Sequence, residues 1–532
     1  MLVGYVSDER YLAVPNVSFE FERDGTVTTA LSTASGAVRA DLEPGAYRVT
    51  FVREGYGSKI VEVVLDAASP RTFRLLSDDL LGYAWPKVVR SGDRAEFRVH
   101  SPEAYKLELW RYGRQKERVS LIGWFDEHGP RATVQITPDG DYSQTGVRWN
   151  EQGYTHPHHK QYVAAPERSG LYYFHVKTES GRFFSFPWVV APKIPSAPIA
   201  VLASDINWNA YNNFGGRSNY IHPAGLPSRP TVNARVELDR YNDPDHIHYK
   251  AESYPPLSFD RPEPLNHIPE QVEATDPIEG RSACHTAPAE WRLLAWLERE
   301  GFAYDLYSET QFHHGEVDLD AYRVLVLGPH PEYWTGAMYD RLKGWTQDQG
   351  GRLMYLGGNG LNCEVDLNDE ASMVVHNGRE PERLAAGLES RFHARRESEA
   401  NVLGVVFDDA GIMTAAPYRT IDSSHWIFEN TGLRQGDLFG LNSQHERCPG
   451  GASGHETDKI SSSSPPGTHL VAQGTNPDKG GADMVVFDTD SDGMVFSTGS
   501  INYISSLLVD DHVSRITHNA LTRFLSQSTA TS

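Results

Sequence analysis

Three loops rich in polar side chains are the part of the sequence most able to do chemistry. They follow apolar runs at residues 199–203, 323–327 and 352–356, and they combine amide, phenol, imidazole and carboxylate groups. The loops read DINWNAYNNFGGRSNY (205–220), GPHPEYW (328–334) and GGNGLN (357–362). Ligands of open parallel sheets bind where the strands end, so the three loops predict one site at one sheet edge. Each loop taken alone is also explained as ordinary turn-forming sequence.

Common catalytic signatures are missing from the sequence. There is no GxSxG, GxxxxGK[ST] or HExxH motif, and residues 358–363 (GNGLNC) depart from GxGxxG at the last position. This disfavours a nucleotide-dependent enzyme and a zincin. Cys363 has no Gly-x-Cys-x-Gly surroundings, so we interpret it as a buried structural thiol. His246 and His248 have metal-like HxH spacing, but we favour a solvated loop pair because no further ligand lies nearby.

Strands and helices that alternate along the chain must position these loops. The three apolar runs predict buried strands, and helical patterns begin at Thr286 and Thr335, each a candidate N-cap. A strand, a helix and a second strand with short connections form a βαβ unit, so we expect a mainly parallel sheet. Further strands at 484–487 and 494–497 and a last helix at 513–525 are also predicted, whereas the Gly- and Ser-rich residues 450–467 predict an exposed loop.

The N-terminal third has the period-two alternation of antiparallel strands. Residues 42–56 (LEPGAYRVTFVREGY) resemble the transthyretin-like β-sandwich of carboxypeptidase regulatory modules, which implies a first sandwich at residues 1–76. A second alternating region predicts an Ig-like sandwich at residues 77–192. The proline-rich residues 191–198 suit a stiff linker to the domain at 193–532.

Composition limits the partners and the compartment. The 71 acidic side chains against 49 Lys and Arg give a net charge of −22, which disfavours nucleic acid and anionic membranes as partners. No apolar run approaches the length of about 18 residues that a membrane span needs, and residues 1–15 lack the features of a signal peptide. We therefore expect a cytoplasmic protein. Its three cysteines are too few and too scattered for a disulfide framework.

Five motifs in order resemble the large subunit of N,N-dimethylformamidase and its relatives, over about residues 195–527. The motifs are WNAYNNFGGRSNY (208–220), SFDRP (258–262), HPEYW (330–334), YLGGNG (355–360) and GHETD (454–458). The resemblance implies a glutamine-amidotransferase-like α/β domain. The predicted fold class is therefore multidomain, with two N-terminal β-sandwiches followed by this α/β domain and its mainly parallel sheet.

The same resemblance implies a mononuclear ferric centre, Fe(3+), held by two tyrosinates and one glutamate. Carried onto this sequence, the ligands are Tyr211, Glu332 and a tyrosine shortly before the SFDRP motif. Tyr254 is the predicted second tyrosine, and Tyr249 is its rival. The resemblance also places three catalytic residues in the site, namely His330, Asn359 and Glu456.

The chemistry of such a centre agrees with amide hydrolysis. Two phenolates and a carboxylate balance the charge of a trivalent ion, which prefers anionic oxygen, and three protein ligands leave positions open. Such a metal would supply Lewis acidity toward the amide carbonyl or a water molecule, and Glu456 would move a proton from the water to the departing amine. Asn359 and His330 would donate hydrogen bonds to the oxyanion of the tetrahedral intermediate or orient Glu332. We expect the substrate to be a small N-alkylated amide like dimethylformamide. Trp208, Asn209 and Phe214 are expected to shape the pocket, which leaves a bulkier amide, a urea or a carbamate open as the substrate.

Other interpretations of these residues remain open. Without the resemblance, Tyr211 is explained as a core aromatic, Glu332 as a charge at the start of the helix near Thr335, and Glu456 as a solvated loop carboxylate. The chain is then a binding or scaffold protein on the same fold. A zinc-dependent amide hydrolase that uses His246 and His248 is the second rival. The family resemblance implies a homo-oligomer, with a small accessory subunit in some members.

Overall fold

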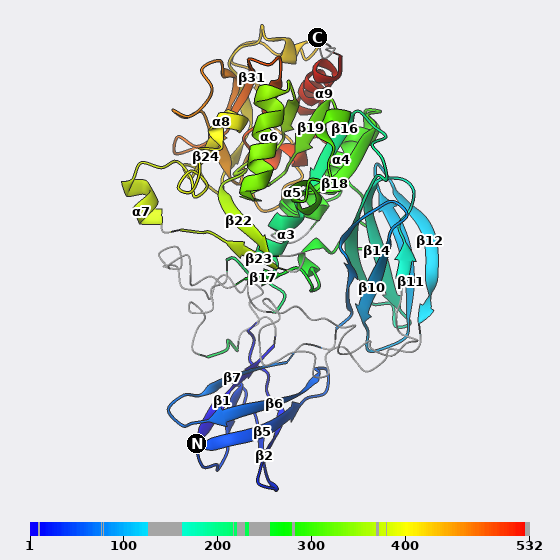
Figure 1. Ribbon diagram of the computed structural model, residues 1–532, viewed down its shortest axis with the longest axis vertical. Coiled ribbons are helices and arrows are strands. Elements are labelled where there is room, and N and C mark those ends of the chain that lie inside the picture. Colours follow the sequence, from blue (N-terminus) through cyan, green and yellow to red (C-terminus); the bar gives the residue numbers. More distant parts are fainter. Residues whose placement is uncertain are drawn as a thin grey trace.

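A computed structural model gives the arrangement of three bodies along the chain. It describes residues 1–8, 11–75, 77, 79–125, 162–215, 218–220, 229–232, 256–278, 282–368, 372–378 and 380–526. A β-sandwich at the N-terminal end, a second β-sandwich and a larger body of helices around a sheet lie in different parts of Figure 1. No described helix is both long enough and apolar enough to cross a membrane.

The first body consists of two small sheets packed face to face. Its strands are β1 (Leu2–Ser7), β2 (Ser18–Arg23), β3 (Thr26–Leu31), β4 (Ala37–Arg39), β5 (Gly45–Val52), β6 (Ser58–Leu65) and β7 (Arg71–Arg74). The sheets have the orders β4-β1-β7 and β3-β2-β5-β6. Phe19 and Phe51 from one sheet pack against Phe73 from the other, as the alternation predicts. A turn at Asp24 and Gly25 joins β2 to β3, with φ of 50° and 75°.

The second body is also a pair of sheets around one core. Its strands are β8 (Leu81–Trp85), β9 (Val88–Arg90), β10 (Arg94–His100), β11 (Tyr105–Tyr112), β12 (Lys116–Phe125), β13 (Tyr162–Ala164), β14 (Gly170–Thr178) and β15 (Phe183–Ala191). The orders are β13-β10-β8 and β12-β11-β14-β15-β9. Phe97 of β10 shares a core with Phe174 of β14 and Trp188 of β15. The transthyretin-like and Ig-like assignments, and the boundaries after residues 76 and 192, stay predictions from the sequence.

The third body is built on a nine-stranded sheet of order β18-β16-β19-β21-β32-β31-β30-β26-β27. Its strands are β16 (Ile199–Ala203), β18 (Tyr304–Ser308), β19 (Val324–Leu327), β21 (Arg352–Tyr355), β26 (Tyr418–Thr420), β27 (Leu438–Phe439), β30 (His469–Gly474), β31 (Asp483–Asp488) and β32 (Met494–Ser497). The first five strands in the sheet order pair in parallel, and the other four extend the sheet in antiparallel. The strands predicted at 199–203, 323–327, 352–356, 484–487 and 494–497 are all present.

Helices cover both faces of the parallel part of this sheet. The helices of this body are α3 (Asp205–Tyr211), α4 (Ala287–Arg299), α5 (Glu309–His313), α6 (Gly336–Asp348), α7 (Glu380–Ala385), α8 (Ala400–Leu403) and α9 (Asp511–Ser526), of which α7 lies apart from the sheet (Figure 1). Val201 of β16 shares a core with Trp291 of α4. Leu202, the next residue, packs in the opposite core with Met338 of α6. A strand buried on both faces explains why its sequence is a continuous apolar run rather than an alternating one.

The predicted helix starts agree with the structure in position. Thr335 is the N-cap of α6, and its side chain accepts a hydrogen bond from the Met338 amide at 3.3 Å. Thr286 is the N-cap of α4 with Pro288 in the first turn, although its side chain makes no capping hydrogen bond. Gly301, with φ of +80°, follows the end of α4.

The prediction of an exposed loop over 450–467 is wrong for its first half. Strands β28 (Ser453–Gly454) and β29 (Thr457–Lys459) form there, and Glu456 lies between them. Most residues from 451 to 458 are buried, because β28 pairs with β25 (Ala415–Ala416) and β29 with β24 (Val406–Asp408). The glycines that suggested a loop instead allow close backbone approach. A Cβ on Gly454, for example, would lie 2.3 Å from the Thr414 carbonyl oxygen.

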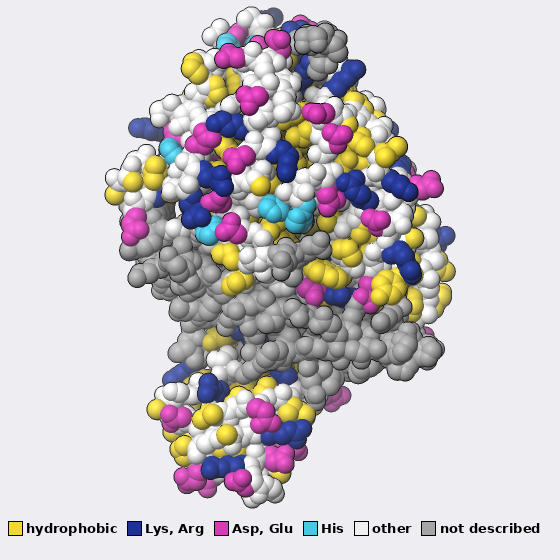
Figure 2. All heavy atoms as spheres, in the orientation of Figure 1, with side chains coloured by type: hydrophobic (Ala, Val, Ile, Leu, Met, Phe, Trp, Pro, Cys, Tyr) yellow, Lys and Arg dark blue, Asp and Glu magenta, His cyan; other side chains and the backbone are white. Residues whose placement is uncertain are grey.

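The third body also contains several short elements. They are β17 (Leu257–Ser258), β20 (Tyr333–Trp334), β22 (Cys363–Asn368), β23 (Ser372–Val375) and the 3-10 helices η6 (Pro264–Asn266), η7 (Ser282–Cys284), η8 (Leu319–Ala321), η9 (Trp426–Phe428) and η10 (Ile501–Ser506). On the face of the molecule in Figure 2, the described Lys and Arg side chains are interspersed with Asp and Glu.

Candidate active site

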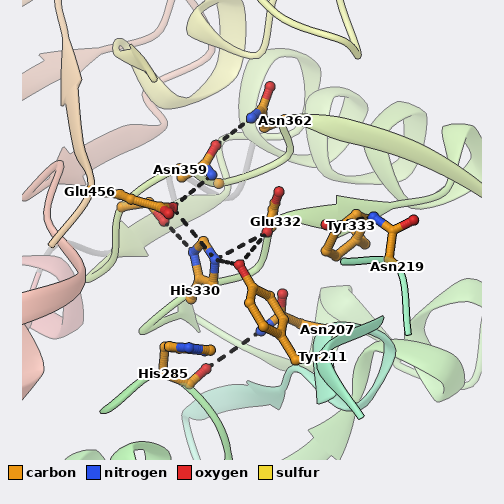
Figure 3. A network of polar contacts seen from close by, with 12 residues as sticks. Asn207, Tyr211, Asn219, His285, His330, Glu332, Tyr333, Asn359, Asn362 and Glu456 are labelled. Atoms are coloured by element: carbon orange, nitrogen blue, oxygen red, sulfur yellow. Dashed lines mark hydrogen bonds and ion pairs between the residues drawn. The ribbon is translucent and has the colours of Figure 1, made fainter. Parts of the chain in front are cut away.

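The three polar loops meet where neighbouring parallel strands end. Tyr211 is the last residue of α3, which follows β16; Glu332 lies in the loop after β19; and Asn359 lies in the loop after β21. Glu456 reaches the same place from the connection between β28 and β29. Figure 3 shows these side chains directed toward one another around His330. Five of the six residues predicted for the site are therefore neighbours in space.

Tyr211 and Glu332 are in direct contact. The Tyr211 hydroxyl donates a hydrogen bond to Glu332 Oε2 at 2.9 Å and lies 2.9 Å from His330 Nε2. All three side chains are buried. Burial, together with the negative charge of Glu332, holds the pKa of Tyr211 well above its ordinary value. The phenol is thus protonated in this arrangement, and a compensating cation is needed to ionise it.

Tyr220 is a site residue that the sequence-based assignment missed. Its hydroxyl lies 2.7 Å from the Tyr211 hydroxyl, 2.7 Å from Glu332 Oε2 and 2.6 Å from the Tyr333 hydroxyl. Its ring stacks on that of Tyr211 at a centroid distance of 4.3 Å. The available signal was its position at the end of the same polar loop as Tyr211, nine residues later. The structure thus describes two phenols and one carboxylate oxygen in mutual contact.

Glu332 is ionised despite its burial. Desolvation opposes the charge, but the hydrogen bond from His330 and the positive charge of Arg391 outweigh it, so the pKa of Glu332 lies well below its usual range. Arg391 Nη2 forms a close ion pair with Glu332 Oε1. Thr335, rather than Glu332, caps α6, so helix capping does not account for the position of Glu332.

His330 carries a positive charge in this environment. Burial lowers its pKa, but the hydrogen bond to Glu332 and the charge of Glu456 raise it to about 9. Its Nε2 lies 3.1 Å from Glu332 Oε2 and 3.7 Å from Glu456 Oε2. Its Nδ1 donates to the Gly358 carbonyl at 2.9 Å, which fixes the orientation of the ring.

Glu456 and Asn359 form a second pair beside His330. The side-chain Nδ2 of Asn359 donates to Glu456 Oε2 at 2.8 Å, and the backbone N–H of Asn359 donates to Asp458 Oδ1 at 2.7 Å. Burial and the charge of Glu332 raise the pKa of Glu456, against the opposing effect of His330. Asn359 has a φ of +52°, which is uncommon outside glycine and asparagine. A carboxyl with a raised pKa in a confined site is suited to proton transfer.

A cavity of about 600 Å³ opens next to this cluster. Glu332, Tyr220, Asn359 and Glu456 line one side of it. Other lining residues include Asn219, Asn362, Asn377, Arg391, Phe407, Asp408 and Ile412. The cluster can therefore be reached by a ligand of moderate size with polar groups.

Some predicted residues lie elsewhere. Trp208 packs in the core beside α4 and donates through Nε1 to Glu290 Oε1 at 2.8 Å, and Phe214 packs in the core of the second sandwich. Asn209 donates through Nδ2 to the Leu257 carbonyl at 3.3 Å. None of these three residues lines the cavity beside the cluster, so the expectation that they shape the pocket is wrong. Cys363 is buried, and burial raises the pKa of its thiol to about 11, in agreement with a structural role.

The predicted second tyrosine is not among the described residues. Tyr254, its rival Tyr249 and the pair His246 and His248 all lie in the segment 233–255, outside the described ranges. Within the part of the chain that the structure describes, no group of three or more His, Cys, Asp or Glu residues is arranged to hold a metal ion. A metal site among these residues would therefore need donors of another kind, such as the phenol oxygens beside Glu332.

Comparison with known proteins identifies the family. The family model described as "N,N-dimethylformamidase beta subunit-like, C-terminal" matches residues 103–516. The N,N-dimethylformamidase beta subunit of Paracoccus aminophilus is 29% identical over 399 residues, covering 63% of this chain and 49% of that protein. The corresponding subunit of an Alcaligenes species is 26% identical over 483 residues, covering 73% of this chain and 60% of that protein.

The chain thus spans about half to three fifths of the length of these relatives. A solved structure of a DUF3823 family protein from Bacteroides ovatus matches 36% of this chain and 99% of that protein at 10% identity. Its TM-score of 0.13 is too low to indicate a shared fold. The family match covers more than half of the chain and includes every residue of the cluster. The chain therefore belongs to the family of N,N-dimethylformamidase beta subunit-like proteins, of which it carries the C-terminal region.

Proposed function

We propose that this chain hydrolyses the C–N bond of a small N-alkylated amide, with a ferric ion at the cluster around Glu332. The observation that carries the proposal is the meeting of the Tyr211 hydroxyl, Glu332 Oε2 and Glu456 beside an open cavity. The names of the two relatives support an amide as the substrate. The cavity volume of about 600 Å³ also admits amides larger than dimethylformamide.

The donor set fits a hard trivalent cation. Two phenol oxygens and a carboxylate oxygen lie within 2.7 to 2.9 Å of each other, and anionic oxygen is the ligand type that such an ion prefers. Tyr211 and Glu332 would hold the ion together with a second tyrosine. For that ligand we retain Tyr254, with Tyr249 as the rival. Tyr220 is an additional phenol beside the same two oxygens.

The residues around the cluster have distinct tasks in the proposed reaction. A bound ferric ion would supply Lewis acidity toward the amide oxygen or a water molecule. Glu456 accepts a proton from the attacking water and returns it to the amide nitrogen, so that the C–N bond breaks to give a carboxylic acid and an amine. His330, held by Gly358, and Asn359, held by Asp458, present hydrogen-bond donors to the oxygen on which negative charge develops.

We also propose a fold assignment for the α/β body and an assembly for the protein. The parallel strands with helices on both faces support the glutamine-amidotransferase-like assignment of the α/β body. The relatives are named as beta subunits, which supports a multi-subunit enzyme, either a homo-oligomer or one with an accessory subunit.

Metal analysis combined with an amide-hydrolysis assay tests the function. We expect about one iron per chain, a visible absorption band from tyrosinate-to-iron charge transfer, and release of dimethylamine from dimethylformamide or of an amine from a larger amide. A colourless protein that contains zinc would favour the rival through His246 and His248. A protein with no stoichiometric metal that tolerates Glu332→Gln and Glu456→Gln would favour a scaffold.

A further inference from the structure

The two oxygens of Glu332 have different partners. Oε2 faces the Tyr211 hydroxyl at 2.9 Å, the Tyr220 hydroxyl at 2.7 Å and His330 Nε2 at 3.1 Å. Oε1 is bound by Nη2 of Arg391. The carboxylate is thus divided between a side that meets the proposed metal ligand Tyr211 and a side that meets a guanidinium.

Arg391 is itself held in a closed ring of polar contacts. Its Nη1 donates to Asn377 Oδ1 at 3.0 Å, and its guanidinium lies 5.8 Å from the centre of the Tyr333 ring. Asn377 and Asn219 exchange two hydrogen bonds of 2.7 and 3.0 Å. Asn219 Nδ2 also donates to the Tyr333 hydroxyl at 2.9 Å, which lies 2.6 Å from the Tyr220 hydroxyl. From Tyr220 the ring returns to Glu332.

This ring fixes the geometry on both sides of the carboxylate. A planar guanidinium with several N–H donors keeps its orientation better than a single flexible ammonium group does. The contact to Asn377 and the Tyr333 ring leaves Arg391 little freedom to release Oε1. The other described Arg that lines the cavity is Arg383, and it donates instead to the Leu388 and Glu389 carbonyls.

We infer that Arg391 is a positioning residue that makes Glu332 bind the metal through Oε2 alone. A carboxylate can bind a cation through one oxygen or through both. By occupying Oε1, Arg391 excludes the two-oxygen mode and keeps one more coordination position for the amide or for water. The inference rests on the proposed function, because it assumes a ferric ion at Oε2.

Arg391→Gln tests the inference directly in the full-length protein loaded with iron. We expect the variant to keep iron, while Glu332 shifts to two-oxygen binding in a crystal structure or in X-ray absorption spectra. The additional donor oxygen makes the iron a weaker Lewis acid, so the charge-transfer band moves to shorter wavelength. We expect kcat for amide hydrolysis to fall about 10- to 100-fold, the usual effect of removing a group that orients a ligand.

Two further variants sharpen the test. Arg391→Lys retains a positive charge at Oε1, so we expect one-oxygen binding and a smaller loss of kcat. Arg395→Gln is the matched control, since Arg395 lies on the same segment and pairs with buried Glu364 rather than with the cluster. Its band position, metal coordination and kcat should match those of the unmodified protein.

The possible outcomes separate this inference from the function on which it rests. An unmodified protein that binds no iron or hydrolyses no amide overturns both. If that protein is an active iron enzyme, but Arg391→Gln keeps its coordination, band and kcat, only the role of Arg391 is overturned. If Arg391→Gln loses its iron, the variant Asn377→Leu tests the inference instead, because it removes a hydrogen-bond partner of Arg391 but keeps Arg391 itself. A band at shorter wavelength and a lower kcat in Asn377→Leu would support the inference. An unchanged band and kcat would overturn it.

Discussion

The Tyr211 hydroxyl donates a hydrogen bond to Glu332 Oε2 at 2.9 Å, although 121 positions separate the two residues in the chain. The contact exists because β16 and β19 are neighbours in the sheet, so that the elements that follow them meet at one edge. It brings a phenol and an ionised carboxylate together in a buried place, where burial and the charge of Glu332 raise the pKa of Tyr211.

Tyr211→Phe should abolish metal binding and hydrolysis, because it removes one of the proposed anionic ligands while keeping the ring that packs on Tyr220. Iron content, the visible band and amine release should all fall to near background. Tyr307→Phe is the control, since Tyr307 is a buried tyrosine of β18 whose hydroxyl pairs with Tyr322. Full activity in colourless, iron-free Tyr211→Phe would rule out the ferric mechanism.

The second tyrosine can be identified by comparing three phenylalanine variants. We expect Tyr254→Phe to lose the band and the iron, and Tyr249→Phe to retain both. Tyr220→Phe should keep iron with weaker affinity, because its hydroxyl contacts both Tyr211 and Glu332. If instead Tyr220→Phe lost iron completely and Tyr254→Phe kept it, Tyr220 would replace Tyr254 in the ligand set.

Glu456→Gln should retain iron but lower kcat by about 10²- to 10⁴-fold, the usual contribution of general acid–base catalysis. The base must be ionised, and its pKa is raised. In the unmodified protein the rate should therefore fall as the pH drops through the pKa of Glu456, which lies above that of an ordinary glutamate. Glu446→Gln, an exposed glutamate in the preceding loop, serves as the control. A Glu456→Gln enzyme with normal kcat would assign the proton transfer elsewhere.

Asn359 allows backbone and side-chain effects to be separated. Its φ of +52° suits asparagine and glycine, whereas alanine in this region costs roughly 1 kcal/mol or more. Both Asn359→Gly and Asn359→Ala should lower kcat, because both remove the contact with Glu456. Only Asn359→Ala should also lower the free energy of unfolding. Equal activity of both variants and the unmodified protein would exclude a catalytic contribution of the side-chain amide.

Glu290 makes stability depend on pH. Burial raises its pKa to about 8, against the hydrogen bonds from Trp208 and the Ser204 amide. Above the ordinary glutamate pKa, the unfolded chain loses this proton while the folded chain keeps it, so the free energy of unfolding falls as the pH rises toward 8. The decline attributable to this group is on the order of 5 kcal/mol.

Glu290→Gln retains a carbonyl acceptor and removes the titration, so denaturant unfolding from pH 5 to 8 should show a shallower decline. Glu273→Gln, an exposed glutamate outside the core, should leave the decline unchanged. Parallel pH profiles of Glu290→Gln and the unmodified protein would contradict the assignment.

The parts of the structure that depend on local periodicity could be predicted from the sequence. The apolar runs at β16, β19 and β21 and the cap at Thr335 follow directly from side-chain patterns, and strand order then brings Tyr211 and Glu332 together. The role of Tyr220 did not emerge, because a tyrosine in a glycine- and asparagine-rich loop has no periodic signal. Its environment is set by residues far away in the chain.

The buried segment around Glu456 was also mispredicted. Gly454 and its neighbours have the composition of a surface loop, and only tertiary pairing with β24 and β25 buries them. The contact between Arg391 and Glu332 could not be predicted from the local sequence either. Nothing near Arg391 in the sequence indicates that its partner is Glu332, which lies 59 positions earlier.

Phe214, three residues after Tyr211, inserts into the hydrophobic core of the second sandwich, and the next carbonyl, that of Gly215, accepts a hydrogen bond from Arg74 of the first. The stretch that joins Tyr211 to Tyr220 is thereby anchored outside the body that carries the chemistry. Trimming the chain to the α/β body alone, as a protein engineer would to obtain a minimal enzyme, would remove both anchor points. We expect Tyr211 and Tyr220 in such a truncated protein to lose their positions beside Glu332, because the segment that contains Phe214 and Gly215 would no longer be held by the sandwiches.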